Sequence, residues 1–267
     1  MIAVFDSGYG GLTVLKPLMD LMPEYDYVYL GDSARAPYGG HSDETIKKMS
    51  KEAVDYLFKI GAKLIVFACN TATSTSLEFV KSECLSEDDL KSIVGVLESA
   101  AIKAVDISET SIGVVGTTAT VNSGAYERKI KELDASKKVH SKACPLLVPF
   151  IEEDWYKSVE AKMVLKKYVR PLKHASVDTL ILGCTHYPIM KKQFQKVMGK
   201  SVTIVDSGFV MAESLKAYLD TNKELQAKLS KTGKREFLTT DDPVRFKKFV
   251  EKNFGMKISI PKQIKLV

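Results

Sequence analysis

The sequence predicts an α/β fold of two pseudo-symmetric, doubly wound parallel-sheet domains. Short apolar runs alternate with helical patterns along all 267 residues, which is typical of repeated strand–helix units. The strand-like runs are continuously apolar, as expected for parallel strands buried on both faces. Similar runs begin at Ile2 and Ile112, 110 residues apart, and at Leu64 and Leu180, 116 residues apart. Buried strands resemble one another, but the matching order of polar residues after each strand favours a repeat.

The first half of the chain alternates four strands with four helices. We expect the strands at 2–6, 26–32, 63–69 and 92–98, and the helices at 10–22, 43–61, 73–83 and 99–107. Asp43 is the expected N-cap of the second helix and Gly61 its expected stop. Pro17 lies inside the first helix, where we expect it to kink or shift the helix.

The second half continues the same alternation. We expect strands at 111–116, 139–144, 177–184 and 202–206, and helices at 119–134, 158–173, 188–199 and 208–220. The charged stretch 223–236 is expected to be an exposed helix and loop. The end of the chain carries a strand-like run at 235–240, a helix at 241–255 and a last short run at 257–260.

The composition is that of an ordinary globular protein. The net charge is +6, from 39 Lys and Arg against 33 Asp and Glu. The lysines interleave with acids on helix-like faces, so we interpret them as a solvated surface rather than a nucleic-acid surface. The first residues show no positively charged or apolar leader pattern, so we expect no targeting segment, and no apolar run reaches membrane-spanning length. We therefore expect a cytoplasmic protein without membrane or nucleic-acid partners.

The four cysteines are expected to be free thiols. They are separated by 15, 60 and 40 residues, so no CxxC motif indicates a zinc ribbon or a thioredoxin site. Too few histidines and cysteines lie near any one cysteine to predict a metal site. Cys84 and Cys144 fit small buried hydrophobes. Cys69 and Cys184 instead lie among polar residues.

Polar side chains gather where the predicted strands end, which is where parallel α/β folds bind ligands. Helix N-termini at such positions cradle anions and lower the pKa of a thiol. The motif DSGYGG lacks the Lys-Ser/Thr of a P-loop, so it is weak evidence for a bound nucleotide. A small carboxylate would fit this anion-binding loop as well as a phosphate would. The strand-end residues are Asp6, Ser7, Asp32, Cys69, Asn70, Thr71, Thr117, Thr118, Thr120, Cys184, Thr185 and His186.

Two of these residues, Cys69 and Cys184, suggest a specific chemistry. If the two halves face each other, the two thiols approach one cleft from opposite sides. A thiolate could then remove a proton from one face of a substrate carbon while a thiol donates a proton to the other face, without a cofactor. Asp6 and His186 are placed to set which thiol is charged. Nucleophilic catalysis by Cys184 with His186 is an alternative, but it leaves Cys69 unexplained.

The motifs as a set resemble a known family. The chain contains, in order, FDSGYGGLTVL, GDSARAPYG, VFACNTAT, GTTAT, LLVPFIEE, LILGCTHYP, DSG and FLTTDDPVRF. In this order they resemble bacterial glutamate racemases, within the aspartate/glutamate racemase superfamily, from Ile2 to about the last ten residues. Aspartate racemases share the paired cysteines but usually not the combination of DSGxGG with PYG.

The resemblance implies a cofactor-independent racemase that converts L-glutamate to D-glutamate for peptidoglycan synthesis and cell shape. It implies that Cys69 and Cys184 are the acid/base residues, assisted by Asp6 and His186. Asp32 and Glu152 match acidic positions near the site, and the adjacent Glu153 could take the place of Glu152. The implied substrate-binding residues are Asp6, Ser7, Pro37, Tyr38, Gly39, Asn70, Thr71, Thr118, Thr185 and His186.

The resemblance also implies two α/β domains with the active site in the cleft between them. We place the first domain at 1–93 plus 207–267, because the C-terminal segment of the family returns to it, and the second at 94–206. We expect glutamate as the small-molecule substrate, no cofactor or metal, and a homodimer. Two alternatives are a racemase for aspartate or another amino acid, and an inactive relative that acts as a binding module.

Overall fold

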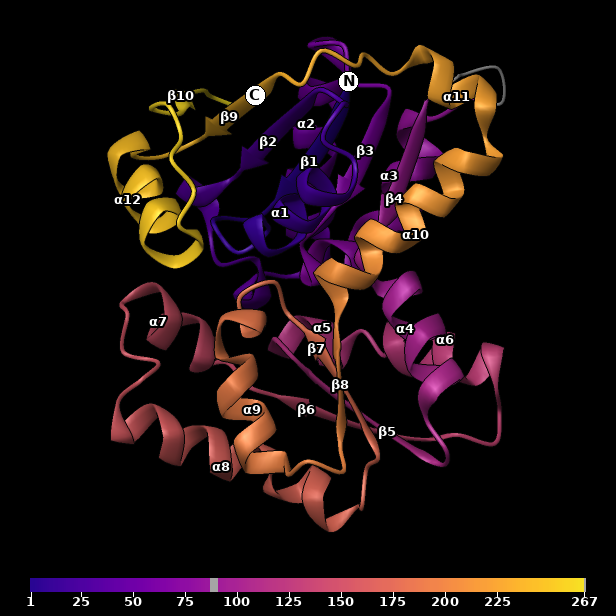
Figure 1. Ribbon diagram of the computed structural model, residues 1–267, viewed down its shortest axis with the longest axis vertical. Helices are drawn as coiled ribbons and strands as arrows, with labels where there is room; N and C mark the ends of the chain where they lie inside the picture. Colours follow the sequence, from indigo (N-terminus) through magenta and orange to yellow (C-terminus); the bar gives the residue numbers. More distant parts are fainter. Residues whose placement is uncertain (87–90, 267) are drawn as a thin grey trace.

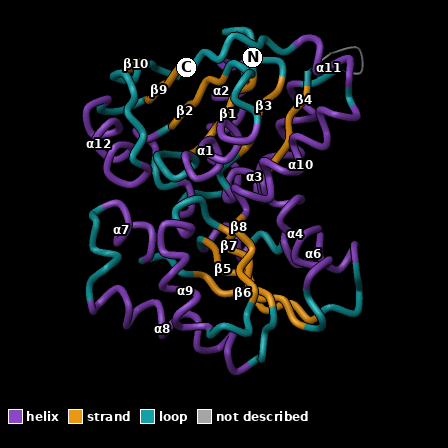
Figure 2. The backbone as a smooth tube through the Cα atoms, viewed as in Figure 1, coloured by secondary structure: helices purple, strands orange, loops and turns teal. Residues whose placement is uncertain are grey.

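The chain forms two parallel β-sheets, each flanked by helices (Figures 1 and 2). The computed structural model describes residues 1–86 and 91–266. The first sheet has the order β10–β9–β2–β1–β3–β4 and the second the order β6–β5–β7–β8, with every adjacent pair parallel. The predicted fold class is confirmed. The strands are β1 (Ile2–Asp6), β2 (Tyr27–Gly31), β3 (Leu64–Phe67), β4 (Ser92–Gly95), β5 (Ser111–Gly116), β6 (Lys138–Ala143), β7 (Thr179–Gly183), β8 (Thr203–Asp206), β9 (Arg235–Thr239) and β10 (Lys262–Gln263).

Helices cover both faces of each sheet. Helices α2 and α3 pack on one face of the first sheet, and α1 packs on the other. Helices α4 and α6 pack on one face of the second sheet, and α8 and α9 pack on the other. Helix α10 packs against both α1 and α4 and so joins the two halves (Figure 1). The helices are α1 (Leu12–Leu21), α2 (Asp43–Lys59), α3 (Asn70–Cys84), α4 (Val96–Ile107), α5 (Thr118–Asn122), α6 (Ala125–Leu133), α7 (Leu147–Glu152), α8 (Val159–His174), α9 (Lys191–Met198), α10 (Ser207–Thr221), α11 (Lys223–Lys228) and α12 (Pro243–Phe254), with 3-10 turns η1 (Ser33–Arg35), η2 (Tyr38–Gly40) and η3 (Tyr187–Met190).

The predicted repeat is present in the sheet topology, because β6–β5–β7–β8 reproduces the order β2–β1–β3–β4. Ile2 of β1 pairs with Leu64 of β3, and Ile112 of β5 pairs with Thr179 of β7. Leu64 and Thr179 therefore occupy equivalent positions in the two sheets. The sequence comparison of the apolar runs, which aligned Leu64 with Leu180, is therefore one residue out of register. Cys69 lies five residues after Leu64 and Cys184 lies five residues after Thr179, so the two cysteines also occupy equivalent positions. The cysteines mark the structural repeat more accurately than the apolar runs do.

Several local boundaries differ from the predictions. Ser42, not Asp43, caps α2, because its hydroxyl accepts a hydrogen bond from the Thr45 N–H at 3.3 Å and Asp43 is already in the first turn. Helix α1 contains Pro17 and continues to Leu21. The predicted strand 92–98 ends early, since α4 begins at Val96.

The C-terminal segment completes the first sheet. Strand β9 pairs with β2, and the short β10 pairs with β9. The run 257–260 forms no strand, and the pairing occurs two residues later, in β10. Helix α12 reaches the second half, where Arg245 pairs with Glu153 at 3.5 Å and Lys252 pairs with Asp154 at 2.6 Å. Among the described residues, no helix is both long enough and apolar enough to cross a membrane.

Candidate active site

The predicted site residues converge on one small pocket between the two sheets. It lies at the carboxyl ends of β1, β3 and β7, as expected for parallel strands. Its free volume is about 20 Å³, close to the space that one water molecule needs. The lining residues are Ser7, Pro37, Tyr38, Gly39, Cys69, Asn70, Thr71, Thr117, Val148, Cys184, Thr185 and His186.

The two halves touch closely around this pocket. A Cβ atom on Gly10 would lie 2.4 Å from Thr185 Oγ1 and 2.6 Å from His186 Nδ1, so a side chain there would push the halves apart. Thr13 Oγ1 donates a hydrogen bond to the Thr185 carbonyl at 2.9 Å. A Cβ atom on Gly39 would likewise lie 2.7 Å from the Cβ of Thr117 in the second half. These contacts pack loops of the first half against loops of the second half around the pocket.

Cys69 lies at the N-terminus of α3 and is 5% exposed. The Ala72 N–H donates to its Sγ at 3.4 Å, and the thiol lies 3.4 Å from Ser7 Oγ. Burial, followed by the charge of Asp6, raises the pKa of the Cys69 thiol to about 12. We expected the helix N-terminus to lower this pKa, but burial and Asp6 outweigh it. Cys69 is therefore a protonated thiol in this structure.

Cys184 has different neighbours, because a 3-10 turn rather than an α-helix follows it. Its Sγ lies 3.9 Å from His186 Nδ1, and His186 Nε2 lies 3.0 Å from Glu152 Oε1. Burial lowers the pKa of His186, but the contacts with Cys184 and Glu152 outweigh burial and raise it to about 10. For Glu152, burial raises the pKa, but the hydrogen bond from His186 outweighs burial, so the pKa of Glu152 is lowered overall. At neutral pH an imidazolium therefore stands between the Cys184 sulfur and a carboxylate.

Asp6 lies behind the pocket rather than in its wall. It is fully buried and accepts hydrogen bonds from the Gly8 N–H at 3.0 Å and from Thr185 Oγ1 at 3.2 Å. Burial raises the pKa of Asp6, although the nearby His186 charge acts in the opposite direction. Asp6 thus connects the loop after β1 to the loop that carries Cys184.

Asp32 also lies behind the pocket, where it anchors a lining residue. It is fully buried and accepts hydrogen bonds from Tyr38 Oη at 2.5 Å, from Arg35 Nε at 2.7 Å and from Thr240 Oγ1 at 2.9 Å. Its carboxylate therefore holds the loop that contains Tyr38 and Gly39 in place. The structure gives Asp32 no direct contact with the space between the thiols.

Asn70 presents a free donor in the wall of the pocket. Tyr126 Oη of the second half donates to Asn70 Oδ1 at 2.6 Å, while the buried Asn70 Nδ2 has no hydrogen-bond partner. A buried amide donor without a partner is costly, so it marks a position where a ligand acceptor fits. Nearby, Thr71 Oγ1 lies 2.9 Å from Thr117 Oγ1 of the second half. Tyr126 was not predicted as a site residue, and Thr117 was predicted at a strand end but not among the substrate-binding residues.

Comparison with known proteins agrees with this geometry. A sequence model of the family described as Asp/Glu/Hydantoin racemase matches residues 14–215. The chain belongs to this family. Within it, the glutamate racemase of Thermoanaerobacter pseudethanolicus is 41% identical over 257 residues, covering 96% of this chain and 94% of that protein.

Solved structures of glutamate racemases are similar to this racemase over its whole length. The crystal structure of isoform RacE1 from Bacillus anthracis has a TM-score of 0.91 at 34% identity, covering 100% of this chain and 97% of that one. The enzyme from Francisella tularensis, in complex with D-glutamate, has a TM-score of 0.90 at 32% identity and covers 99% of this chain and 97% of that one.

Besides Asp6 and Asp32, the predicted residues Thr118 and Glu153 of this racemase also lie apart from the pocket wall. Thr118 is exposed, because the residue that caps α5 and faces the pocket is Thr117, whose hydroxyl accepts from the Thr120 N–H at 3.2 Å. The pattern of two threonines three residues apart is an N-cap signal that identifies Thr117. Of the two acids, Glu152 contacts His186, whereas Glu153 is exposed and faces Arg245. Among the described residues, no group of three or more His, Cys, Asp or Glu side chains could hold a metal ion.

Proposed function

We propose that this protein interconverts L- and D-glutamate by a two-base mechanism without a cofactor, with Cys69 and Cys184 as the catalytic residues. One observation carries the proposal. The two thiols line a single pocket from equivalent positions of two repeated sheets, and their ionisable neighbours differ, Asp6 near Cys69 and His186 beside Cys184. This arrangement suits a reaction in which one sulfur must be charged and the other neutral.

The resting state follows from the neighbours of each thiol. Cys69 holds its proton because it is buried beside Asp6. The imidazolium of His186 lies beside the Cys184 sulfur, where it can pair with the thiolate that the proposed mechanism needs. In one direction the Cys184 thiolate takes the proton from the substrate α-carbon, and the electron pair of the broken C–H bond stays on that carbon. Cys69 then delivers its proton to the opposite face and becomes the thiolate, which is the state that serves the other enantiomer.

The pocket wall offers hydrogen-bond donors for the carboxylate groups of an amino acid, and its hydroxyls can also accept from the ammonium group. The free Asn70 Nδ2 and the hydroxyls of Ser7, Thr71 and Thr185 can bind carboxylate oxygens. Tyr38, held by Asp32, closes one side. A relative of 32% identity forms a complex with D-glutamate, which supports this choice of substrate.

Substrate entry requires the two halves to separate. The pocket volume of about 20 Å³ is far below the roughly 300 Å³ or more of typical ligand sites. The ion pairs from α12 to Glu153 and Asp154 are exposed and can open at small cost. Closure around the substrate would exclude water from the charged sulfur.

The direct test is a racemisation assay by circular dichroism over a panel of L- and D-amino acids. We expect activity with glutamate that is unchanged by added pyridoxal phosphate. Faster racemisation of aspartate would assign the enzyme to the related specificity. No racemisation of any amino acid by the folded protein would contradict the proposal and favour a binding role.

Several further expectations accompany the proposal. The family resemblance supports a role in supplying D-glutamate for peptidoglycan, a cytoplasmic location and a homodimer. The membership of β9 and β10 in the first sheet supports domains at 1–93 plus 207–267 and at 94–206. Limited proteolysis would test the domain boundaries, and light scattering would test the oligomeric state.

A further inference from the structure

The positive charge of this protein is concentrated in one segment. Residues 158–200, which contain α8 and α9, carry nine Lys and Arg against two Asp and Glu, a net charge of +7. The remainder of the chain has 30 basic and 31 acidic residues and is therefore almost neutral at −1. The excess charge of +6 is thus a property of α8, α9 and their connections, where only two acids accompany nine basic residues.

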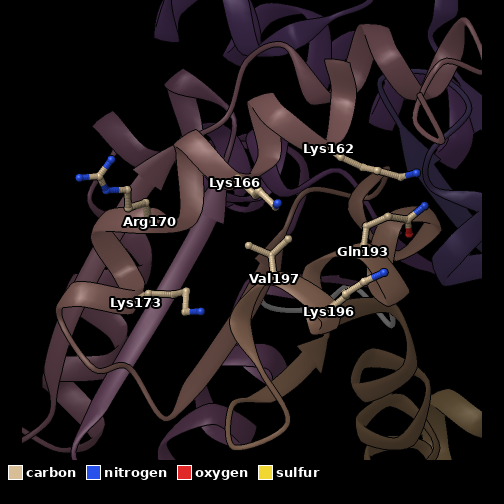
Figure 3. Close-up of a pocket in the computed structure, with 7 residues that line it drawn as sticks. All are labelled: Lys162, Lys166, Arg170, Lys173, Gln193, Lys196 and Val197. Atoms are coloured by element: carbon tan, nitrogen blue, oxygen red, sulfur yellow. The ribbon is translucent and has the colours of Figure 1, made fainter. Parts of the chain in front are cut away.

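The fold directs part of this charge into a groove between α8 and α9 (Figure 3). The groove has a volume of about 560 Å³ and lies apart from the pocket that contains the two cysteines. Gln193 and Val197 of α9 also line it. The five cations in its wall are Lys162, Lys166, Arg170 and Lys173 of α8 and Lys196 of α9.

The cations of α8 form a row along one face of the helix. Lys162, Lys166 and Arg170 are spaced four residues apart, which places successive side chains about 6 Å apart along the axis. With Lys173, the row spans about 16 Å. Such a row is costly for the isolated helix, because like charges four residues apart repel.

In the part of the chain that the structure describes, no acidic side chain pairs with this row. Within residues 1–86 and 91–266, none of the five cations of the groove has an ion-pair partner. A second groove, on α2, is a useful contrast. It has a volume of about 460 Å³ and contains Lys47, Lys48 and Lys51, but Glu44, Glu52 and Asp55 line the same wall. There Lys51 pairs with Asp55 at 2.7 Å.

We propose that the groove between α8 and α9 binds an oligophosphate anion, either an inorganic chain or the phosphate chain of a nucleotide. Lys and Arg side chains form strong, charge-assisted hydrogen bonds with phosphate oxygens. A chain of several phosphates can reach cations on both walls, whereas a single carboxylate or phosphate would leave most of the row unpaired. The proposal does not depend on racemase activity.

The lining of the groove argues against two other polyanions. Single-stranded nucleic acids bind through aromatic side chains on which their bases stack, and no aromatic residue lines this groove. An anionic membrane surface is flat and would meet the rim rather than the interior of a concave site. A groove of this volume matches a small-molecule ligand.

The test is isothermal titration calorimetry of the full-length protein with tripolyphosphate, ATP and adenosine. We expect tripolyphosphate and ATP to bind with similar affinity and adenosine not to bind. The affinity should fall several-fold between about 50 mM and 200 mM salt, because the exposed charges are screened. If wild-type protein binds neither phosphate compound at millimolar concentration, the proposal is wrong.

Matched double variants locate the site. Lys166→Gln with Lys196→Gln removes one cation from each wall and should weaken tripolyphosphate binding about tenfold or more. Lys47→Gln with Lys48→Gln removes the same charge from the compensated groove and should change binding less than about twofold. Lys48, Lys166 and Lys196 are exposed and Lys47 is half-buried, so far-ultraviolet circular dichroism and racemase turnover should stay unchanged. An equal loss in both double variants, or tighter binding of a thymidine oligonucleotide than of tripolyphosphate, would overturn the proposal.

Discussion

Cys69 and Cys184 follow equivalent strands of two sheets with the same order, yet their immediate surroundings differ. Cys69 caps a full α-helix and is buried near the carboxylate of Asp6. Cys184 precedes a single 3-10 turn and lies beside His186, which is held by Glu152. The backbone is repeated, whereas the charges around the two sulfurs are not.

The difference shows how a symmetric scaffold can support a reaction that needs asymmetry. A racemase works in both directions, so two sulfurs at equivalent positions suit the two faces of the substrate. The proposed mechanism nevertheless needs one thiol and one thiolate, and two identical surroundings would not distinguish the two sulfurs. The surroundings differ, because Asp6 helps to raise the pKa of Cys69, whereas the His186 imidazolium lies beside Cys184.

The largest expected effect comes from removing either sulfur. We expect Cys69→Ala and Cys184→Ala each to reduce racemisation by about a thousandfold or more, since general acid–base groups contribute about 10²–10⁴-fold. Each variant keeps one base, so each should still exchange the α-proton of one enantiomer with solvent. The two variants should retain exchange with opposite enantiomers, measured by NMR in D₂O.

The predicted exchange pattern requires that each cysteine acts on only one face of the substrate. Cys84→Ala is the matched control, because Cys84 is a free cysteine outside the pocket. It should retain full activity. Exchange of both enantiomers by one of the alanine variants would show that a single base reaches both faces.

His186→Gln should produce the next largest effect. Loss of the imidazolium removes the positive charge beside Cys184, and we expect a fall in kcat/KM of about a hundredfold. The fall should be equal in both directions, because the equilibrium constant between enantiomers is one. Glu152→Gln should cost less, since the imidazole ring remains.

The same substitution has a consequence for stability against pH. The folded pKa of His186 is about 10 and its unfolded value is 6.5, so its charge stabilises the folded state. This stabilisation is complete below pH 6.5 and is lost as pH rises towards 10. The difference in Tm between wild type and His186→Gln should therefore shrink over that range. A difference that stays constant from pH 6 to pH 10 would contradict the assigned charge.

The sequence was sufficient for the fold class, because strand–helix patterns are local, and the family resemblance implied most of the pocket residues. Cys69 and Cys184 were singled out by the polar residues that follow their strands and by the repeat of that order. The raised pKa of Cys69 was not predictable, because it depends on burial between two halves that are far apart in sequence. Tyr126 was missed because its hydroxyl meets Asn70 through a contact between residues 56 positions apart. The charged groove also required the packing of α8 against α9.

Tyr126→Phe tests whether the second half orients a binding group of the first. Without the hydroxyl, Asn70 can rotate and its free Nδ2 is no longer fixed in the pocket. Losing one such hydrogen bond costs about 0.5–1.5 kcal/mol, so we expect KM to rise about two- to tenfold with kcat within twofold. Tyr27→Phe is the control, since the Tyr27 hydroxyl donates only to backbone carbonyls away from the pocket. It should lower Tm without changing KM.

The smallest expected effects compare two adjacent threonines. Thr117 caps α5 and meets Thr71 across the halves, so Thr117→Ala should lower stability by about 1 kcal/mol and weaken substrate binding a few-fold. Thr118 is exposed, so Thr118→Ala should stay within about 0.5 kcal/mol and leave KM unchanged. Denaturant unfolding and steady-state kinetics would measure both. A larger effect of Thr118→Ala than of Thr117→Ala on KM would mean that Thr118, the residue implied by the sequence resemblance, lines the pocket of the working enzyme.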